Sequence, residues 1–291
     1  MALRLRSPAK INLFLNVLGK RPDGFHELET LFERISLCDT ITLTAIPSGV
    51  QVTSNNRQIP RGPKNLAYRA AKLLQEQLPF KKGVRICIEK KIPVSAGLGG
   101  GSSNAATVLL GLNRLWKLGL SRQKLIALGA KLGSDVPFFI LEKPFALGTG
   151  RGEILKAALA PEKLKIWHCL VKPRFGISTQ EAYQSLNAPP LSRLTHPKAD
   201  VKMTLHSIRK KDKGALSRLL TNSLELVLNK RVRGIFRIKN ELLRHGALAA
   251  LMSGSGSCVF GIFASKKEAG SAARYLKKKN KSWQVFVTST F

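Results

Sequence analysis

The sequence predicts an α+β protein built from two domains, and three features of the chain support this fold class. Residues 3–18 largely alternate apolar and polar side chains, the pattern of a half-buried strand in antiparallel β structure. Residues 84–116 predict a strand, a glycine-rich loop and a helix in that order. In the last third of the chain, helical and strand patterns follow one another. We expect the first domain to close with a glycine cluster at residues 146–152, so that the domains span 1–155 and 156–291.

The length and composition predict a globular, cytoplasmic protein. With 291 residues, 44% hydrophobic and 23% charged, the chain is long enough to bury a large core. No apolar run approaches the ~20 residues of a membrane span, and patterned sequence from Leu3 onward leads us to expect no removable leader. The cysteines are far apart and lie in or near apolar runs, which predicts reduced core residues rather than metal ligands. They are Cys38, Cys87, Cys169 and Cys258.

The net charge of +32 makes a nucleic-acid partner a serious alternative. Lys and Arg number 49 against 17 acidic residues, but they are spread along the chain, with short runs at 209–211 and 277–279. Spread charge is usually solvated surface, and it also suits polyanionic small substrates. Because no aromatic RNA-binding motif is present, we expect small-molecule partners, no membrane and no nucleic acid, and a monomer or weak homodimer.

A glycine-rich stretch at Pro93–Ala106 carries the strongest chemical signal. It follows a predicted strand at Val84–Glu89 and leads into a predicted helix at Ala105–Trp116. Either Ser102 or Ser103 is placed to cap that helix. Glycine has no side chain, so a polyanion can approach the backbone N–H groups, and the helix start adds unpaired donors and a positive dipole end. We therefore interpret the loop as a phosphate site rather than a flexible linker.

Common phosphate loops do not match this stretch. A Walker A loop needs lysine after its last glycine, and a dinucleotide or protein-kinase loop needs glycine where this chain has Ser102. The stretch resembles the second motif of the GHMP kinases, the group of galactokinase, homoserine kinase and mevalonate kinase. Ser7–Leu13 and Arg21–Leu28 narrow the resemblance to the members that act on 4-diphosphocytidyl-2-C-methyl-D-erythritol. Ser253–Gly256 is similar to the third GHMP motif.

The resemblance implies a fold, a reaction and the molecules involved. The implied fold is the two-domain GHMP kinase fold, with a ribosomal-protein-like N-terminal ATP-binding domain and a ferredoxin-like C-terminal α/β sandwich. The implied reaction is ATP-dependent phosphorylation of the 2-hydroxyl of that substrate, in the non-mevalonate pathway to isoprenoid precursors. ATP and Mg²⁺ are the implied cofactors.

Carried over residue by residue, the resemblance also implies roles for single positions. Asp135 is implied to be the catalytic carboxylate, which accepts or orients the hydroxyl proton, and Lys10 to hold it ionised and to offset charge on the transferred group. The residues expected to bind ATP are Asn65, Pro93, Gly97, Leu98, Gly99, Gly100, Gly101, Ser102 and Ser103. Those expected to bind the cytidyl substrate are Asn12, Phe25, His26, Thr179 and Tyr183. Direct metal ligands are unknown, with Ser103 as a candidate beside the ATP phosphates.

Several of these residues also have a purely structural interpretation. Asp135 could cap a short helix that begins near Val136, but of the five aspartates it alone adjoins both a glycine and a strongly apolar run. Asp39, by contrast, simply follows a strand-like run. Lys10 could be one more exposed lysine, and Asn65 could be only a helix cap.

Two other functions stay open on the sequence. One is a GHMP kinase for a different small alcohol, against which the Phe25-His26 pair argues. Many relatives have tyrosine at the position of Phe25, so stacking on cytosine is kept here while the hydroxyl contact is lost. The other is an RNA-associated basic protein, which salt-sensitive RNA binding without kinase activity would indicate.

Overall fold

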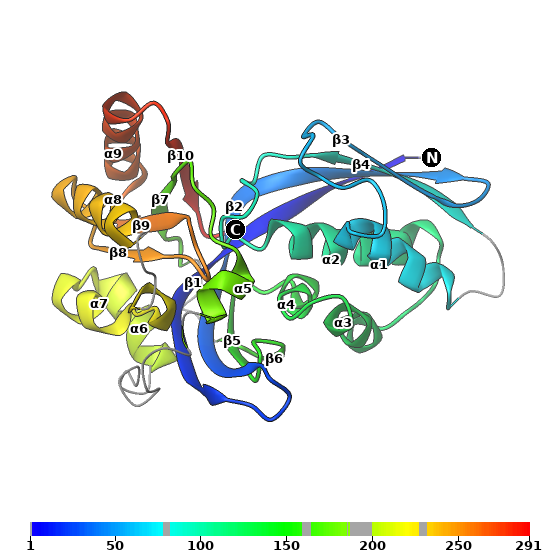
Figure 1. Cartoon of the computed structure of the whole chain (residues 1–291), viewed down its shortest axis with the longest axis horizontal. Helices are drawn as coiled ribbons and strands as arrows, with labels where there is room; N and C mark the ends of the chain where they lie inside the picture. The colour runs from blue at the N-terminus through cyan, green and yellow to red at the C-terminus, as the bar shows by residue number, and fades with distance from the viewer. Residues whose placement is uncertain (1, 78–81, 159–163, 185, 187–199, 227–231) are drawn as a thin grey trace. The chain divides into compact units, whose positions relative to one another are not determined.

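A computed structural model describes residues 2–77, 82–158, 164–184, 186, 200–226 and 232–291 (Figure 1). The chain forms two compact units. The first unit comprises Met1–Ala9, Leu37–Val94 and Gly99–Lys143, and the second comprises Lys10–Ser36, Ser95–Leu98 and Pro144–Phe291. Each unit therefore draws on three separate stretches, whereas the boundary expected near residue 155 is a single cut and stays a prediction.

The first unit packs helices against a small group of strands. Strand β4 (Gly83–Glu89) pairs antiparallel with the C-terminal part of β2 (His26–Ile46), with Thr40 opposite Glu89, and parallel with β3 (Val50–Ser54). The helices are α1 (Leu66–Gln75), α2 (Gly100–Leu115), α3 (Arg122–Ala130) and α4 (Val136–Leu141). Helix α2 lies beside α1 and also contacts α3 and α4 (Figure 1). The strand, loop and helix expected around the glycine stretch are therefore present.

A glycine lets α2 lie close to the strands of the first unit. At Gly111 a Cβ atom would lie 2.5 Å from Leu43 Cδ1 and 2.6 Å from Leu5 Cδ1. Leu43 belongs to β2 and Leu5 to β1 (Ala2–Lys20). Any side chain at Gly111 would therefore overlap one leucine side chain from each strand. The neighbouring α2 side chains that are fully buried include Ala105, Ala106, Val108, Leu109 and Leu112.

The second unit contains a four-stranded antiparallel sheet in the order β10-β7-β9-β8. Its strands are β7 (Trp167–Lys172), β8 (Ala249–Met252), β9 (Val259–Phe263) and β10 (Gln284–Ser289). Helices α8 (Val232–Arg244) and α9 (Lys266–Lys279) pack against it. Numbered along the chain, these strands lie in the order 4-1-3-2, the ferredoxin-like arrangement expected of the C-terminal domain.

A hairpin and several short helices complete the second unit. Strands β5 (Phe145–Thr149) and β6 (Ile154–Ala157) pair antiparallel, as the glycine cluster between them predicts. Strand β5 also pairs with residues 30–33 of β2. The helices are α5 (Thr179–Gln184), α6 (Val201–Lys210) and α7 (Lys213–Leu219), followed by a 3₁₀ turn at Ser223–Leu226.

The structure corrects some predicted element bounds. Residues 28–37, expected as a mix of strand and loop, and residues 40–45, expected as another strand, all belong to the single strand β2. Glu33 and Asp39 break its apolar pattern, yet both are fully buried and hydrogen-bonded, so the strand continues through them. The helix expected over 216–228 is shorter, ending at Leu219. Residues 187–202 were expected to form a surface loop, but helix α6 begins within them, at Val201. Residues 187–199 lie outside the described part.

No helix in the described ranges is long and apolar enough to cross a membrane. All four cysteines lie within those ranges, and none forms a disulfide. Cys169 and Cys258 are buried, and burial raises the pKa of each thiol to about 12. Cys38 and Cys87 are only half-buried, so the expected core position is correct for two of the four.

Replacing Gly111 with leucine should destabilise the protein, because the new side chain overlaps Leu43 and Leu5. We expect Gly111→Leu to lower the free energy of unfolding by about 1–3 kcal/mol. The matched control is Gly270→Leu in α9, where a Cβ meets only Arg274 Nη1, at 3.7 Å, and helix propensity favours the change. Urea unfolding measures both variants, and equal stability of the two would contradict the packing described for α2.

Candidate active site

The first unit presents unpaired backbone donors at the start of α2. Gly99 is the N-cap residue, with φ of 65° in the left-handed region, and its carbonyl accepts the Ser103 N–H at 2.8 Å. Within the described chain, the N–H groups of Gly100, Gly101 and Ser102 donate to no other residue. The positive end of the α2 dipole adds to these donors, so this helix start suits an anion.

The cap expected at Ser102 or Ser103 is wrong, because both serines lie inside α2. Gly99 adopts its positive φ without a steric penalty, so the backbone turns into the helix at Gly100 instead of Ala105. The Ser103 side chain serves a different purpose. It is fully buried, and its Oγ lies 2.8 Å from the Oγ of Ser7.

The earlier part of the glycine stretch belongs to the second unit and packs against the third motif. Gly97 has φ of +72°, and a Cβ there would lie 2.0 Å from the Ser253 carbonyl oxygen. The Ser253 hydroxyl donates to the Gly97 carbonyl at 3.0 Å, and the Cys258 N–H donates to the Ala96 carbonyl at 3.2 Å. Only glycine fits at residue 97, and the two motifs expected near the phosphates are in direct contact.

Two other residues expected to bind ATP have clear structural roles. Asn65 caps α1: its Oδ1 accepts the Ala67 N–H at 2.9 Å, and its Nδ2 donates to the Pro60 carbonyl at 2.6 Å. Leu98 is 1% exposed, and its carbonyl accepts the Lys10 N–H at 3.0 Å. Contact of either residue with ATP, like that of Pro93, stays a prediction.

Lys10 and Asn12 form a buried polar pair in the second unit. They share one face of β1 and are 4% and 1% exposed, so Lys10 is not an ordinary surface lysine. Lys10 Nζ donates to Asn12 Oδ1 at 2.7 Å, and Asn12 Nδ2 donates to Thr30 Oγ1 at 2.7 Å. A Cβ at Gly254 would lie 3.1 Å from Asn12 Oδ1 and 3.3 Å from Lys10 Nζ. The third motif therefore needs glycine here to approach the pair.

Asp135 precedes α4 without capping it. The residue occupies the N-cap position with φ of −81° and ψ of −14°, and its side chain makes no capping hydrogen bond. It is half-buried. The structural interpretation as a helix cap is therefore not observed, and the catalytic role stays a prediction. The expected pairing of Asp135 with Lys10 joins residues of different units and also stays a prediction.

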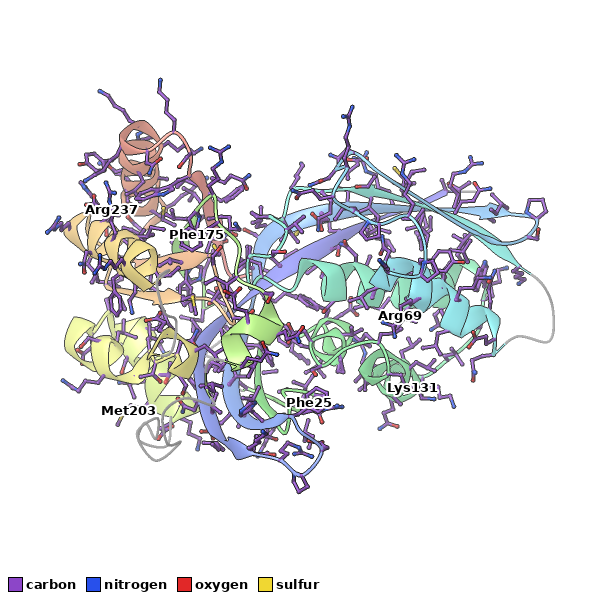
Figure 2. The ribbon with its side chains drawn as sticks, viewed as in Figure 1. Phe25, Arg69, Lys131, Phe175, Met203 and Arg237 are labelled. Carbon is purple, nitrogen blue, oxygen red and sulfur yellow. The ribbon has the colours of Figure 1, made fainter. Side chains whose placement is uncertain are left out.

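His26 and Tyr183, far apart in the sequence, stack in the second unit. Their ring centroids are 5.5 Å apart and their planes differ by 29°. His26 is 8% exposed, and burial lowers its pKa below the usual value of 6.5. Phe25, on the turn between β1 and β2, is 53% exposed (Figure 2). Thr179 begins α5, but its side chain lies outside the described part.

A dedicated metal cage is absent from the described residues: no group of three or more His, Cys, Asp or Glu side chains there could hold an ion. The Mg²⁺ expected with ATP stays a prediction. Because the Ser103 hydroxyl is buried against Ser7, its part in a metal site stays a prediction. The free donors at Gly100–Ser102, by contrast, fit phosphate oxygens directly.

Sequence reasoning missed several residues near these groups. Thr30 orients Asn12, and the Arg151 guanidinium lies 4.7 Å from the Phe25 ring centroid. Asp39 is fully buried beside the segment that leads into the glycine stretch. For Asp39 the available signal was an acid between two strand-like runs, and no local pattern marks the other two residues.

Comparison with known proteins agrees with this geometry. The family of GHMP kinases N terminal domains matches residues 65–143, and that of GHMP kinases C terminal domains matches residues 204–282. A 4-diphosphocytidyl-2-C-methyl-D-erythritol kinase of Geobacillus kaustophilus is 48% identical over 264 residues, 90% of this chain and 88% of that protein. One of Geobacter metallireducens is 46% identical over 280 residues, 94% and 93% of the two chains. A crystal structure of a 4-(cytidine 5'-diphospho)-2C-methyl-D-erythritol kinase has a TM-score of 0.84 at 33% identity, covering 99% of this chain and 98% of that chain.

These likenesses define a GHMP kinase, with the two-domain fold and the use of ATP that mark this class. Within the class, the chain belongs to the family of the 4-diphosphocytidyl-2-C-methyl-D-erythritol kinases, because 48% identity extends over most of both sequences. The fold and the kinase class inferred from the motifs are confirmed.

The lowered pKa of His26 leads to a measurable result. Burial is the largest cause and the charge of Lys20 the second, so Lys20→Ala should raise the pKa of His26 part of the way toward 6.5. Since the folded state binds this proton less readily than the unfolded state, His26 should destabilise the protein as pH falls through 6.5 toward the folded pKa. Titration by NMR measures the pKa in both proteins. A value above 6.5 in the parent, or a fall in Lys20→Ala, would overturn this assignment.

Proposed function

We propose that the chain transfers the γ-phosphoryl group of ATP to the 2-hydroxyl of 4-diphosphocytidyl-2-C-methyl-D-erythritol, a step toward isoprenoid precursors outside the mevalonate route. The observation that carries the proposal is the row of unpaired backbone donors at Gly100–Ser102, which suits the phosphates of ATP. The choice of alcohol is supported by relatives 48% and 46% identical, whose names state that substrate.

In the proposed reaction, the hydroxyl oxygen bonds to the γ-phosphorus while the bond from that phosphorus to the β,γ-bridging oxygen breaks. ADP leaves with the electron pair of the broken bond, and the hydroxyl proton passes to the Asp135 carboxylate. A tertiary alcohol is a weak nucleophile at neutral pH, so orientation and proton acceptance by a fixed carboxylate lower the barrier.

Lys10 is proposed to offset negative charge on the transferring group. Lys10 is 4% exposed, and its ammonium is oriented by Asn12, which Thr30 holds in turn. A cation held away from water acts more strongly on nearby charge than one in solution, and it needs no reorganisation during the reaction. Mg²⁺ on the phosphate oxygens would neutralise further charge when bound.

The cytidyl group is proposed to bind beside Phe25 and His26. A neutral imidazole offers one donor and one acceptor, and the edge of cytosine offers both kinds of group in return. The lowered pKa keeps His26 neutral near pH 7, and the stacked Tyr183 ring fixes its plane. The exposed Phe25 ring offers a π face for stacking on the base. The resemblance to the family supports a contact of Thr179 with the same group.

The proposed partners are small molecules. ATP and a diphosphate ester are both polyanions, and a net charge of +32 favours their approach. We further propose that the protein works in the cytoplasm as a monomer or weak homodimer, without a nucleic-acid partner.

Incubation with ATP, Mg²⁺ and 4-diphosphocytidyl-2-C-methyl-D-erythritol tests this function. We expect ADP and a singly phosphorylated product, identified by mass spectrometry and ³¹P NMR, and no product from homoserine or mevalonate. Turnover of either of those alcohols, with none of the cytidyl substrate, would show a GHMP kinase of different specificity.

Asp135→Asn should lower kcat by about 10²–10⁴-fold, since an amide cannot accept the hydroxyl proton. Asp212→Asn is the matched control: Asp212 caps α7 through the Ala215 N–H, and asparagine caps equally well. The control should keep parent activity. Unchanged kcat in a folded Asp135→Asn protein would remove Asp135 from the mechanism.

A further inference from the structure

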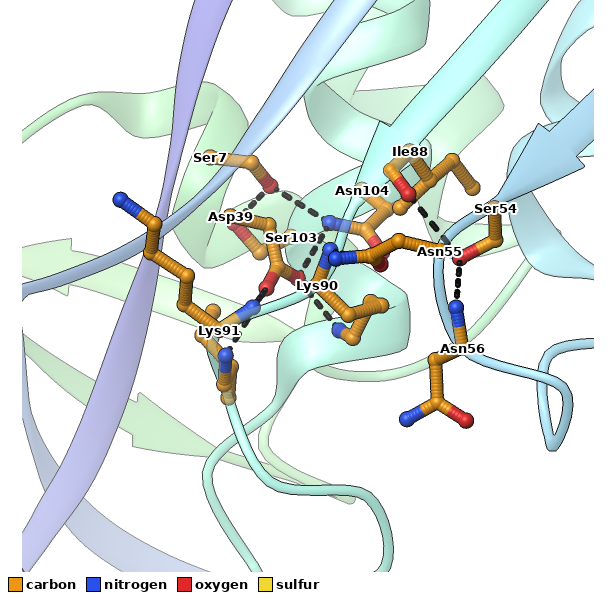
Figure 3. Close-up of polar contacts among 11 residues, drawn as sticks. Ser7, Asp39, Ser54, Asn55, Asn56, Ile88, Lys90, Lys91, Ser103 and Asn104 are labelled. Atoms are coloured by element: carbon orange, nitrogen blue, oxygen red, sulfur yellow. Dashed lines mark hydrogen bonds and ion pairs between the residues drawn. The ribbon is translucent and has the colours of Figure 1, made fainter.

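Asp39 of the first unit hydrogen-bonds the segment that leads into the glycine stretch (Figure 3). It lies in β2 next to Thr40, which pairs with Glu89, the last residue of β4. Its Oδ1 accepts the N–H groups of Lys91 and Ile92, at 2.8 and 2.9 Å. The backbone is therefore fixed just before the chain enters Pro93 and the glycines.

The other carboxylate oxygen of Asp39 holds the helix that follows the glycines. Asp39 Oδ2 accepts from Asn104 Nδ2 of α2 at 2.9 Å and pairs with the ammonium of Lys90. Asn104 Nδ2 also donates to Ser7 Oγ at 2.9 Å, and Ser7 Oγ meets Ser103 Oγ at 2.8 Å (Figure 3). The Asp39 side chain thus hydrogen-bonds residues before the glycines, at Lys91 and Ile92, and after them, at Asn104.

This arrangement leaves Asp39 no spare acceptor. An ionised carboxylate has about four acceptor positions, and here two N–H groups, an amide and an ammonium fill them. The Asp39 side chain is 0% exposed and that of Lys90 is 5% exposed, so their charges are shielded from solvent. A Cβ at Gly100 would lie 3.1 Å from Lys90 Nζ, so this network reaches the first residue of α2.

We propose that Asp39 is a positioning residue for nucleotide phosphate: by holding Ile92 and Asn104 at once, it fixes the start of α2 so that the donors of Gly100–Ser102 point at one place. The proposal rests on the proposed function only in taking ATP as the ligand of those donors. Asp39 itself touches no substrate. Its removal should therefore weaken the binding of phosphate groups and leave the binding of the adenosine moiety unchanged.

Asp39→Asn tests this directly, because asparagine keeps the size and one acceptor oxygen. With that oxygen facing Lys91 and Ile92, its NH₂ group would face the donors of Lys90 and Asn104, which breaks the link to α2. We expect the affinity for the ATP analogue AMPPNP, measured by calorimetry with Mg²⁺, to fall roughly ten-fold or more, the loss of a charge-assisted hydrogen bond. Adenosine affinity should stay within about two-fold of the parent.

A second variant covers the case in which Asp39→Asn fails to fold. Asn104→Ala leaves the Asp39–Lys90 ion pair intact but removes the link to α2, and it should show the same selective loss of AMPPNP affinity. The matched control is Glu33→Gln in the second unit, a carboxylate also fully buried and bonded to His168 and Thr290. Glutamine keeps the oxygen that both partners contact, so AMPPNP affinity should stay unchanged.

The outcomes separate the two proposals. Equal losses for AMPPNP and adenosine, or no loss in Asp39→Asn or Asn104→Ala, would show that Asp39 is merely structural. Selective loss in a protein that phosphorylates no cytidyl alcohol would support Asp39 and reject the proposed acceptor. A parent protein that binds no AMPPNP at all would overturn both.

Discussion

The proposed phosphate site depends on three backbone N–H groups at the start of α2. Gly100, Gly101 and Ser102 leave their donors unused because the helix supplies no acceptor for its first turn. Gly97 and Gly99 both adopt positive φ angles, and at Gly97 any side chain would strike the Ser253 carbonyl. The site is therefore made of main chain, and the surrounding side chains act mainly by holding that main chain in place.

The second unit differs from the first, because its polar groups are side chains that are buried and held by hydrogen bonds. Lys10 is held by Asn12, Asn12 by Thr30, and the Gly254 backbone lies against the pair. A buried lysine loses hydration, so its charge is available to a substrate at a lower reorganisation cost than a surface lysine offers. Burial of His26 has a different effect, since it lowers the pKa of the imidazole and so favours its neutral form.

The sequence predicted the elements well where local pattern decides them. Alternation predicted β1 and β4, the glycines predicted the loop before α2, and the resemblance to GHMP motifs singled out Lys10 and Asn12, which the structure shows to be buried. Sequence-based prediction failed for side chains whose role depends on partners far away in the sequence. Asp39 looks like a strand interruption until Asn104, 65 positions away, and Lys90 are seen to satisfy its carboxylate. The prediction that a serine caps α2 was wrong for a related reason. The hydroxyl of Ser103 contacts Ser7, and no local rule predicts that contact.

The most direct test follows the amide protons of Gly100, Gly101 and Ser102 by NMR as nucleotide is added to ¹⁵N-labelled protein. AMPPNP with Mg²⁺ should move these protons downfield, as hydrogen bonds to phosphate oxygens form, whereas adenosine should not. Amide shifts that stay unchanged at saturating AMPPNP would mean that the phosphates bind elsewhere, and the main-chain site described here would be wrong.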